Sequence, residues 1–274
     1  MPLPRPFQAN HPGNLWRPGF KPSPAHTAEY SPHGPLSKGL GALVLFEHCN
    51  RPGFLDYVQP WNKINFAGLG TSQTATVSPY GGTAFSVSGV DTNLDGLTYA
   101  TSFPSTAIWS FSMLIKFDGG SAGPLFEPPG LVQNSGKTLG INVVGDGSDV
   151  FQWTDDSAFF AAPIISNFTT WTRLTFVADG TNNVTVYTNG QSPNSMTVPG
   201  GTTLSADYLA ASWVWPIADF FWWNRALSAQ EAMAHSVDPY GTTMRPKMDE
   251  WTIVGTSPAG VVKKQGLLTT GVGP

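Results

Sequence analysis

The chain has 274 residues, a mass of 29.3 kDa and a net charge of −4 at pH 7, and only 12% of its residues are charged, about half the usual share. A chain of this length can hold one large all-β domain with additional terminal segments, and its 30 glycines and 24 prolines favour short strands joined by turns. The sequence has no basic field for a nucleic-acid partner, no apolar run long enough to span a membrane, and one cysteine, Cys49, which excludes an internal disulfide.

The N-terminal segment, residues 1–39, is predicted to be an extended arm. Its first 38 residues hold nine prolines and no hydrophobic period. Proline fixes φ and removes a backbone donor, so we expect a polyproline-like strand without a core of its own. At about 3.1 Å per residue it can reach on the order of 100 Å, farther than one domain is wide. Five apolar side chains are candidate anchors on a partner: Phe7, Leu15, Trp16, Phe20 and Tyr30.

Residues 40–240 are predicted to form an all-β body of about ten strands. The clearest strand is 108–117, where Trp109, Phe111 and Met113 alternate with serines, a pattern typical of a half-buried strand. Other strands are predicted at 42–46, 74–78, 85–88, 139–144, 150–153, 171–178, 184–188, 208–214 and 217–223. Many short strands with regular turn signals predict an antiparallel sandwich of two sheets.

One short helix and a second arm complete the predicted order. Ser228 can cap a helix, Glu231 lies at its third position, and helix-forming residues continue to His235. The periodic pattern then fails, and residues 241–274 are expected to form an extended C-terminal arm, with an isolated strand at 251–254 as one option.

Three ordered segments resemble the laminin-G-like, concanavalin A-like jelly-roll family. Residues 84–89 with 108–115 are similar to its early strand pair, and 171–180 with 184–190 to its hairpin ending in Tyr-x-Asn-Gly. Residues 219–228 are similar to its last core strand, which runs into an Asn-Arg-x-Leu-Ser helix start. The resemblance covers residues 40–240 and implies a two-sheet jelly roll.

The residues that follow the helix resemble a tail found after this domain in bacteriophage virion proteins. Asp238-Pro-Tyr-Gly, followed by Met244-Arg-Pro246, is similar to that ending. This similarity implies a virion location after synthesis in a host cytoplasm. The partners would be copies of the protein itself in a homo-oligomer, together with major capsid or other virion proteins.

One segment has the start of a calcium loop. Asp91, Asn93 and Asp95 offer oxygen ligands at alternate positions before Gly96, which suits a hard cation. The twelfth position is Ser102 instead of a bidentate glutamate. The alternative is a polar turn whose side chains cap their own backbone, and in that case no cofactor is needed.

No catalytic set of residues stands out. Glycoside hydrolysis needs two carboxyls across the sugar, and the Glu-x-Asp-x-Glu triplet of the family's glucanases is absent. His48 and Cys49 are adjacent, which would direct their side chains to opposite faces of a strand. The sequence therefore favours a protein that is not an enzyme.

The ten tryptophans offer a second function, because exposed aromatic rings stack on sugars. Trp222 and Trp223 are neighbours in a strand, so we expect one to point inward and the other outward. An outward ring, and Trp251 in the C-terminal arm, would serve as interface aromatics.

The favoured hypothesis is a non-enzymatic phage structural protein, a head decoration or minor capsid protein anchored by its proline-rich arm. The alternative is a tail or fibre module that binds host-surface glycans, and a glycan hydrolase ranks third.

Overall fold

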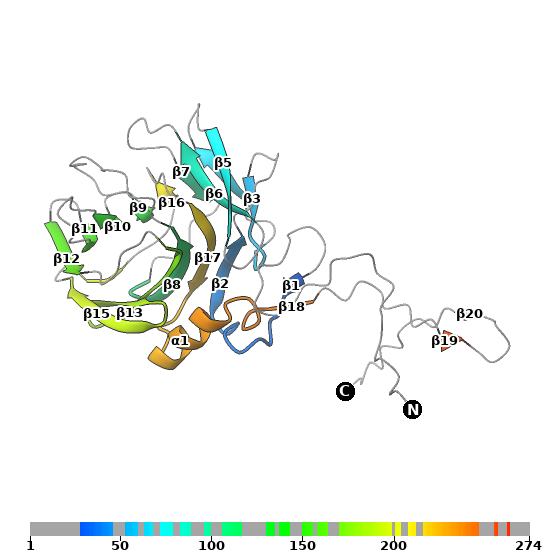
Figure 1. Cartoon of the computed structure of the whole chain (residues 1–274). Coiled ribbons are helices and arrows are strands. Elements are labelled where there is room, and N and C mark those ends of the chain that lie inside the picture. Colours follow the sequence, from blue (N-terminus) through cyan, green and yellow to red (C-terminus); the bar gives the residue numbers. More distant parts are fainter. Residues whose placement is uncertain are drawn as a thin grey trace.

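The computed structural model describes the β-rich body of the chain and short parts of its flanks. The described residues are 28–45, 53–59, 63–67, 72–78, 83–88, 96–99, 106–116, 130–134, 137–142, 150–155, 158–163, 170–198, 201–203, 208–211, 216–246, 255–256 and 262–263. Within these ranges, two antiparallel sheets form two layers, and one short helix covers the outer side of one layer (Figure 1). The predicted all-β, two-sheet sandwich with a short helix is therefore confirmed.

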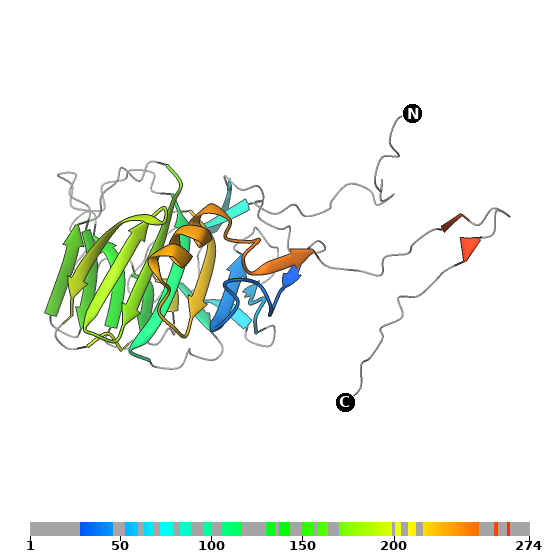
Figure 2. The ribbon, with the colours of Figure 1, turned by 90° about the horizontal axis from the view of Figure 1, so that it is seen from below.

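The first layer, called the helix-side sheet, has eight strands, with β8 and β17 near its centre. Its order is β15 (Gln191–Thr197), β14 (Asn183–Thr188), β13 (Thr172–Asp179), β8 (Ile108–Ile115), β17 (Ile217–Trp223), β6 (Thr83–Ser88) and β5 (Ser72–Val77), and β2 (Leu40–Leu45) also pairs with β17. The helix α1 (Ala229–Val237) lies across this sheet, as Figure 2 shows from below.

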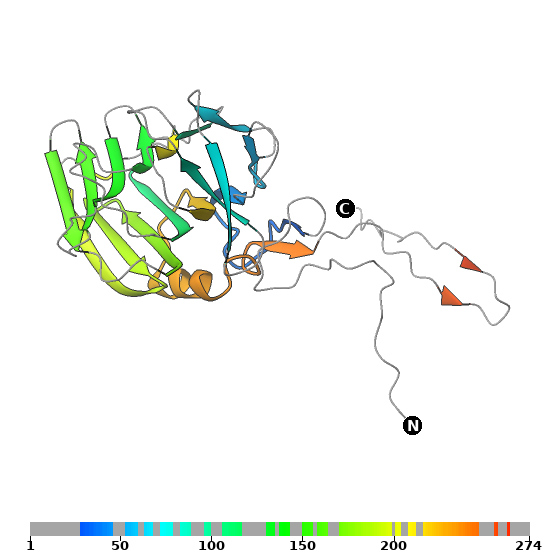
Figure 3. The same cartoon turned by 45° about the horizontal axis from the view of Figure 1, so that its top comes forward.

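The second sheet also has eight strands and forms the opposite layer (Figure 3). Its order is β12 (Ala158–Pro163), β11 (Val150–Asp155), β10 (Lys137–Asn142), β9 (Gly130–Asn134), β16 (Tyr208–Ala211), β7 (Gly96–Tyr99), β4 (Lys63–Ala67) and β3 (Gly53–Leu55). β12 contacts β15 of the helix-side sheet, so the two layers meet along that edge.

Two short ribbons lie outside these sheets. β1 (Ala28–Tyr30) pairs with β18 (Met244–Pro246), and β19 (Gly255–Thr256) pairs with β20 (Val262–Lys263). The sequence patterns did not predict six strands of the sandwich, namely β3, β4, β7, β9, β12 and β15. The isolated strand at 251–254 lies outside the described residues.

The inner face of the helix-side sheet is a stack of aromatic rings. Trp109 lies 5.7 Å from Phe111 and 5.8 Å from Trp222 between ring centroids, and Phe176 lies 4.6 Å from Phe111. All four side chains are fully buried. They occupy alternate positions on β8, β13 and β17, so the opposite positions face α1.

The outer face of β8 is also buried, which corrects the prediction of a half-buried strand. Ser110 and Ser112, expected to face solvent, are 0% exposed. The hydroxyl of Ser110 donates to the carbonyl of Arg225 (3.0 Å) and accepts from the amide of Leu227 (2.9 Å). These bonds hold residues 225–227, which lead into α1, against the sheet. A buried serine hydroxyl without hydrogen-bond partners would destabilise the fold.

The turn between β14 and β15 explains the Asn-Gly signature. Asn189 and Gly190 both have positive φ, 50° and 74°, as a two-residue hairpin turn requires. A Cβ on Gly190 would lie 2.7 Å from Cα of Met233, so the turn is also a close contact with α1. The amide of Arg173 donates to Oδ1 of Asn189 (2.9 Å). This turn therefore positions both the helix and β13.

Candidate functional site

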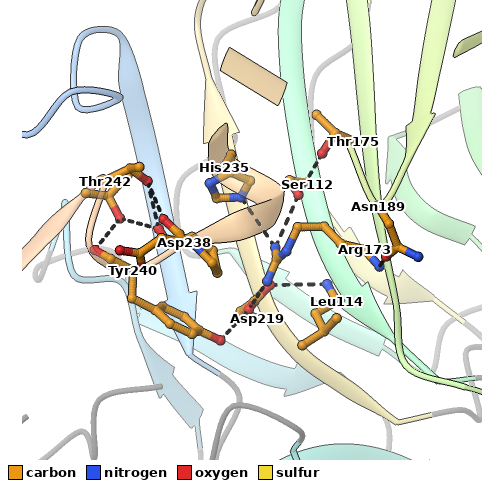
Figure 4. A network of polar contacts seen from close by, with 12 residues as sticks. Ser112, Leu114, Arg173, Thr175, Asn189, Asp219, His235, Asp238, Tyr240 and Thr242 are labelled. Atoms are coloured by element: carbon orange, nitrogen blue, oxygen red, sulfur yellow. Dashed lines mark hydrogen bonds and ion pairs between the residues drawn. The ribbon is translucent and has the colours of Figure 1, made fainter. Parts of the chain in front are cut away.

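A buried ion pair lies between the helix-side sheet and α1 (Figure 4). Arg173 of β13 donates from Nη1 and Nη2 to the two carboxylate oxygens of Asp219 on β17, at 2.9 and 2.7 Å. Arg173 is 1% exposed and Asp219 is 0% exposed. Such a two-point contact is the strongest geometry for this pair, and it compensates two charges that are removed from water.

Other groups complete the hydrogen bonding of Asp219. The hydroxyl of Tyr240 donates to Oδ2 at 2.6 Å, and the amide of Leu114 donates to Oδ1 at 3.1 Å. The ladder between β8 and β17 shifts register between Ile217 and Asp219, so the carboxylate supplies an acceptor for Leu114 at this irregularity. Tyr240 follows α1, so this bond fastens the chain beyond the helix to the sheet.

His235 of α1 completes the buried network. Its Nε2 lies 3.4 Å from Nη1 of Arg173, and because Arg173 can only donate, Nε2 is the acceptor. Its ring packs edge-on against Phe221 (4.5 Å) and Trp223 (5.0 Å). Complete burial and the charge of Arg173 lower the pKa of His235 well below its usual value of 6.5. The imidazole is therefore neutral near pH 7.

The network contains an acid, an imidazole and a phenol, as catalytic sets do, but these side chains are closed to solvent. Asp219, His235 and Tyr240 are each 0% exposed. The network is better explained as the anchor that holds α1 and the following turn on the sheet. The network was not predicted from the sequence, although Arg173 and Asp219, each a single charge inside an apolar strand, were a usable signal.

The start of α1 is fixed as the sequence predicts. Ser228 and Glu231 form a reciprocal capping box, which confirms the predicted cap. Arg225 donates to both carboxylate oxygens of Glu231, at 2.9 and 2.7 Å, and to the carbonyl of Lys38 at 2.7 Å. The bonds from Arg225 lower the pKa of Glu231 to about 2. The Asn-Arg-x-Leu-Ser motif thus joins the helix to the chain segment before β2.

Parts of both predicted arms, residues 28–39 and 241–246, contact the sandwich. Nε1 of Trp223 donates to the carbonyl of Leu36 (2.7 Å), and Leu36 is only 3% exposed. Tyr30 is half-buried against the cluster that contains Leu40, Phe221 and Trp223. Met244 is buried in the same cluster, and the amide of Leu36 donates to the carbonyl of Thr242 (3.1 Å), so described residues on both sides of the predicted boundaries at 39 and 240 pack on the sandwich. Tyr30, predicted as an arm anchor, contacts its own chain, and its hydroxyl donates to the carbonyl of Ser37 (3.3 Å).

The expectation that one of Trp222 and Trp223 is exposed is wrong. Both are 0% exposed. Trp222 faces the inner core, where its Nε1 donates to Oδ1 of Asn224 (2.9 Å). Trp223 points to the other face as predicted, but α1 and the segment around Leu36 cover it. Neither ring can serve as an interface aromatic in this structure.

Trp171 is the partly exposed ring among the four tryptophans whose side chains the structure describes. It directly precedes β13, and its ring packs against Ala84, Leu114 and Ala218. The other three, Trp109, Trp222 and Trp223, are fully buried. Trp171 is thus a partly exposed aromatic side chain, packed against buried residues, just before the start of β13 in the helix-side sheet.

The remaining predicted site residues lie outside the described residues. They are the arm anchors Phe7, Leu15, Trp16 and Phe20, the interface aromatic Trp251, and the calcium candidates Asp91, Asn93 and Asp95. Within the described ranges, no group of three or more His, Cys, Asp or Glu residues could hold a metal ion. No helix of the described part has the length and hydropathy needed to cross a membrane.

Comparisons with known proteins show the fold. No family model and no curated protein sequence matches the chain. Among solved structures, the binding domain of Paraclostridial Mosquitocidal Protein 1 is 13% identical with a TM-score of 0.52. That match covers 73% of this chain and 52% of the toxin domain, so the chain spans about half of that domain's length.

A second match covers nearly all of its counterpart. Domain 4 of AbnA, an extracellular arabinanase of family GH43 from Geobacillus stearothermophilus, is 16% identical with a TM-score of 0.50. The match covers 72% of this chain and 98% of that domain, whose structure was solved in complex with arabinotriose.

The binding domain of Botulinum Neurotoxin DC, in complex with SialylT, is 13% identical with a TM-score of 0.49, over 72% of this chain and 51% of that domain. The similarities to the mosquitocidal toxin domain and to domain 4 of AbnA show the β-sandwich fold.

Proposed function

We propose that the sandwich is a glycan-binding module and that Trp171 is its stacking platform. The observation that carries this proposal is the position of Trp171, a partly exposed side chain that packs against the buried cluster of Ala84, Leu114 and Ala218. A braced ring loses little conformational freedom when a ligand binds, and its aromatic face offers apolar surface to the C–H groups of a sugar ring.

The solved structures support this proposal at the level of the fold. A domain of similar fold was solved with a bound arabinose oligomer, and the alignment covers almost that entire domain. A glycan hydrolase has weaker support, because Asp219, His235 and Tyr240, the acid, imidazole and phenol of the buried network, are closed to solvent. Binding without turnover is therefore the favoured form of this proposal.

The test is a glycan array probed with the full-length protein, followed by titration calorimetry with the best ligand. Trp171→Ala is expected to weaken binding at least about tenfold, because truncation removes the stacking face. Trp171→Phe keeps an aromatic face and should retain most of the affinity. Equal affinity of all three proteins, at unchanged melting temperature, would exclude this platform.

A second candidate function is attachment to a larger assembly such as a phage head. It is favoured by the pairing of β1 with β18, which places Ala28 opposite Pro246, so both flanking segments begin at neighbouring points of the described body. Under this proposal the sandwich is displayed and residues 1–27 form the tether. Deleting 1–27, and not 1–38, is the appropriate test, because residues 28–38 pack on the body. Normal incorporation of the shortened protein into particles would exclude the tether.

A further inference from the structure

The exposed positions of α1 carry no charged residue, although surface helices normally carry charge there. Gln230, Met233, Ala234 and Val237 share one face at positions i, i+3, i+4 and i+7, and all four are exposed. Met233 is 47% exposed and Val237 is 71% exposed. The opposite face, with Ala232 and His235, is buried on the sheet. These four exposed residues are called the α1 stripe.

The N-terminal segment has chemistry that complements this region. Residues 1–27 carry three basic residues, Arg5, Arg17 and Lys21, and no acidic ones. The whole chain has a net charge of −4, so the remaining residues carry −7. Two of the basic residues directly follow large aromatic ones, in Trp16-Arg17 and Phe20-Lys21. An aromatic side chain suits the exposed apolar side chains of the stripe, and its neighbouring cation is attracted by the net negative charge of residues 28–274.

The register of β1 determines which copy can supply the segment. Tyr30 pairs with Met244 and Ala28 pairs with Pro246. Following the chain backward from Tyr30 to Ala28 therefore leads along β18, away from Met244 and from α1. Residues 1–27 can span about 80 Å as a polyproline-like strand, which is longer than one domain is wide. The direction of β1 favours a neighbouring molecule, and the reach is long enough to span the distance to it.

We propose that the α1 stripe is the docking seat for residues 1–27 of a second copy of this chain, with Trp16 and Phe20 as the anchors. The proposal rests on the attachment role suggested above and is independent of glycan binding. Each copy would offer one seat and one arm, so exchange can close a dimer or a ring. Proline restricts the free arm beforehand, which lowers the entropic cost of ordering it.

The test measures self-association of full-length proteins by sedimentation equilibrium. Trp16→Ser with Phe20→Ser removes the anchors, and Met233→Lys with Val237→Lys places cations on the seat. Each double variant should weaken association at least about tenfold. Ile108→Lys is the matched control, because Ile108 is an apolar residue of nearly equal exposure (46%) on a different element. This control should associate like the wild type.

Mixing the two double variants shows whether residues 1–27 dock on the α1 stripe of a neighbouring copy or on that of their own chain. The anchor variant keeps an intact seat and the seat variant keeps an intact arm, so an equimolar mixture should form a complex that neither variant forms alone. The proposal is overturned if the wild type is monomeric at about 100 μM, a range in which weak specific dimers assemble. It is equally overturned if the seat variant associates normally, or if the mixture remains monomeric. Loss of glycan binding in Trp171→Ala would leave these results unchanged.

Discussion

Arg173 and Asp219 lie opposite the same residue, Leu114, on the two strands that flank β8, and their side chains join over it. This contact links three central strands of the helix-side sheet. Tyr240 binds the same carboxylate, and His235 approaches the same guanidinium. The ion pair therefore holds the sheet, α1 and the following turn in one arrangement.

Replacing Asp219 with asparagine is expected to destabilise the protein strongly. The change leaves the buried guanidinium of Arg173 without a counter-charge, and breaking a buried pair in this way costs about 3–5 kcal/mol. Urea unfolding followed by tryptophan fluorescence measures the effect. Asp179→Asn, at an exposed strand end, is the control and should change the free energy of unfolding far less. Similar losses in the two variants would contradict the anchoring role.

Gly190→Ala should destabilise the protein more than Gly201→Ala. Both glycines have positive φ, 74° and 90°, so both substitutions incur backbone strain of about 1 kcal/mol. At Gly190 the new Cβ would also lie 2.7 Å from the Cα of Met233, whereas at Gly201 the nearest atom is 3.8 Å away. The difference in unfolding free energy therefore isolates the contact between the turn and α1. Equal decreases in the free energy of unfolding would show that α1 can move aside to accept the added methyl group.

Stability should fall as the pH drops below about 6.5, because of His235. The unfolded chain takes up a proton near pH 6.5, while the folded protein, in which the pKa of His235 is lowered, does not. Because the unfolded state then binds more protons, the free energy of unfolding decreases with falling pH, by at most about 1.4 kcal/mol per pH unit. Urea titrations between pH 7.5 and 5 measure this slope.

The control for this slope is His235→Gln, which keeps an acceptor for Arg173 but cannot titrate. Glu231, with a pKa of about 2, loses its stabilising effect only as the pH falls from 4.5 toward 2, below this window. Burial raises the pKa of Asp56, but that residue is common to both proteins. Equal slopes in the variant and the wild type would therefore rule out His235 as the source.

The sequence predicted those features that depend on local pattern. Ser228 with Glu231 marked the helix start, and Asn189-Gly190 marked a hairpin turn, since both signals arise from neighbouring residues. The burial of a strand's two faces was harder to predict, because it depends on which other segments cover the strand. One of Trp222 and Trp223 was expected at the surface, because alternation alone does not reveal that α1 and residues near Leu36 lie above Trp223.

The buried network was missed for a similar reason. Arg173 and Asp219 are 46 residues apart, and only the sheet order brings their strands to either side of β8. Trp171 was one of several strand tryptophans in the sequence, and only the structure shows that it is partly exposed whereas Trp109, Trp222 and Trp223 are buried. Long-range pairing and coverage, which no local pattern encodes, decided both cases.

The most direct test of the proposed function is the affinity of the full-length protein and of Trp171→Ala for a glycan selected on an array. We expect measurable binding by the wild type and a loss of at least about tenfold in the variant, with an unchanged melting temperature. Failure of the wild type to bind any glycan, or equal binding by a folded Trp171→Ala variant, would contradict the account.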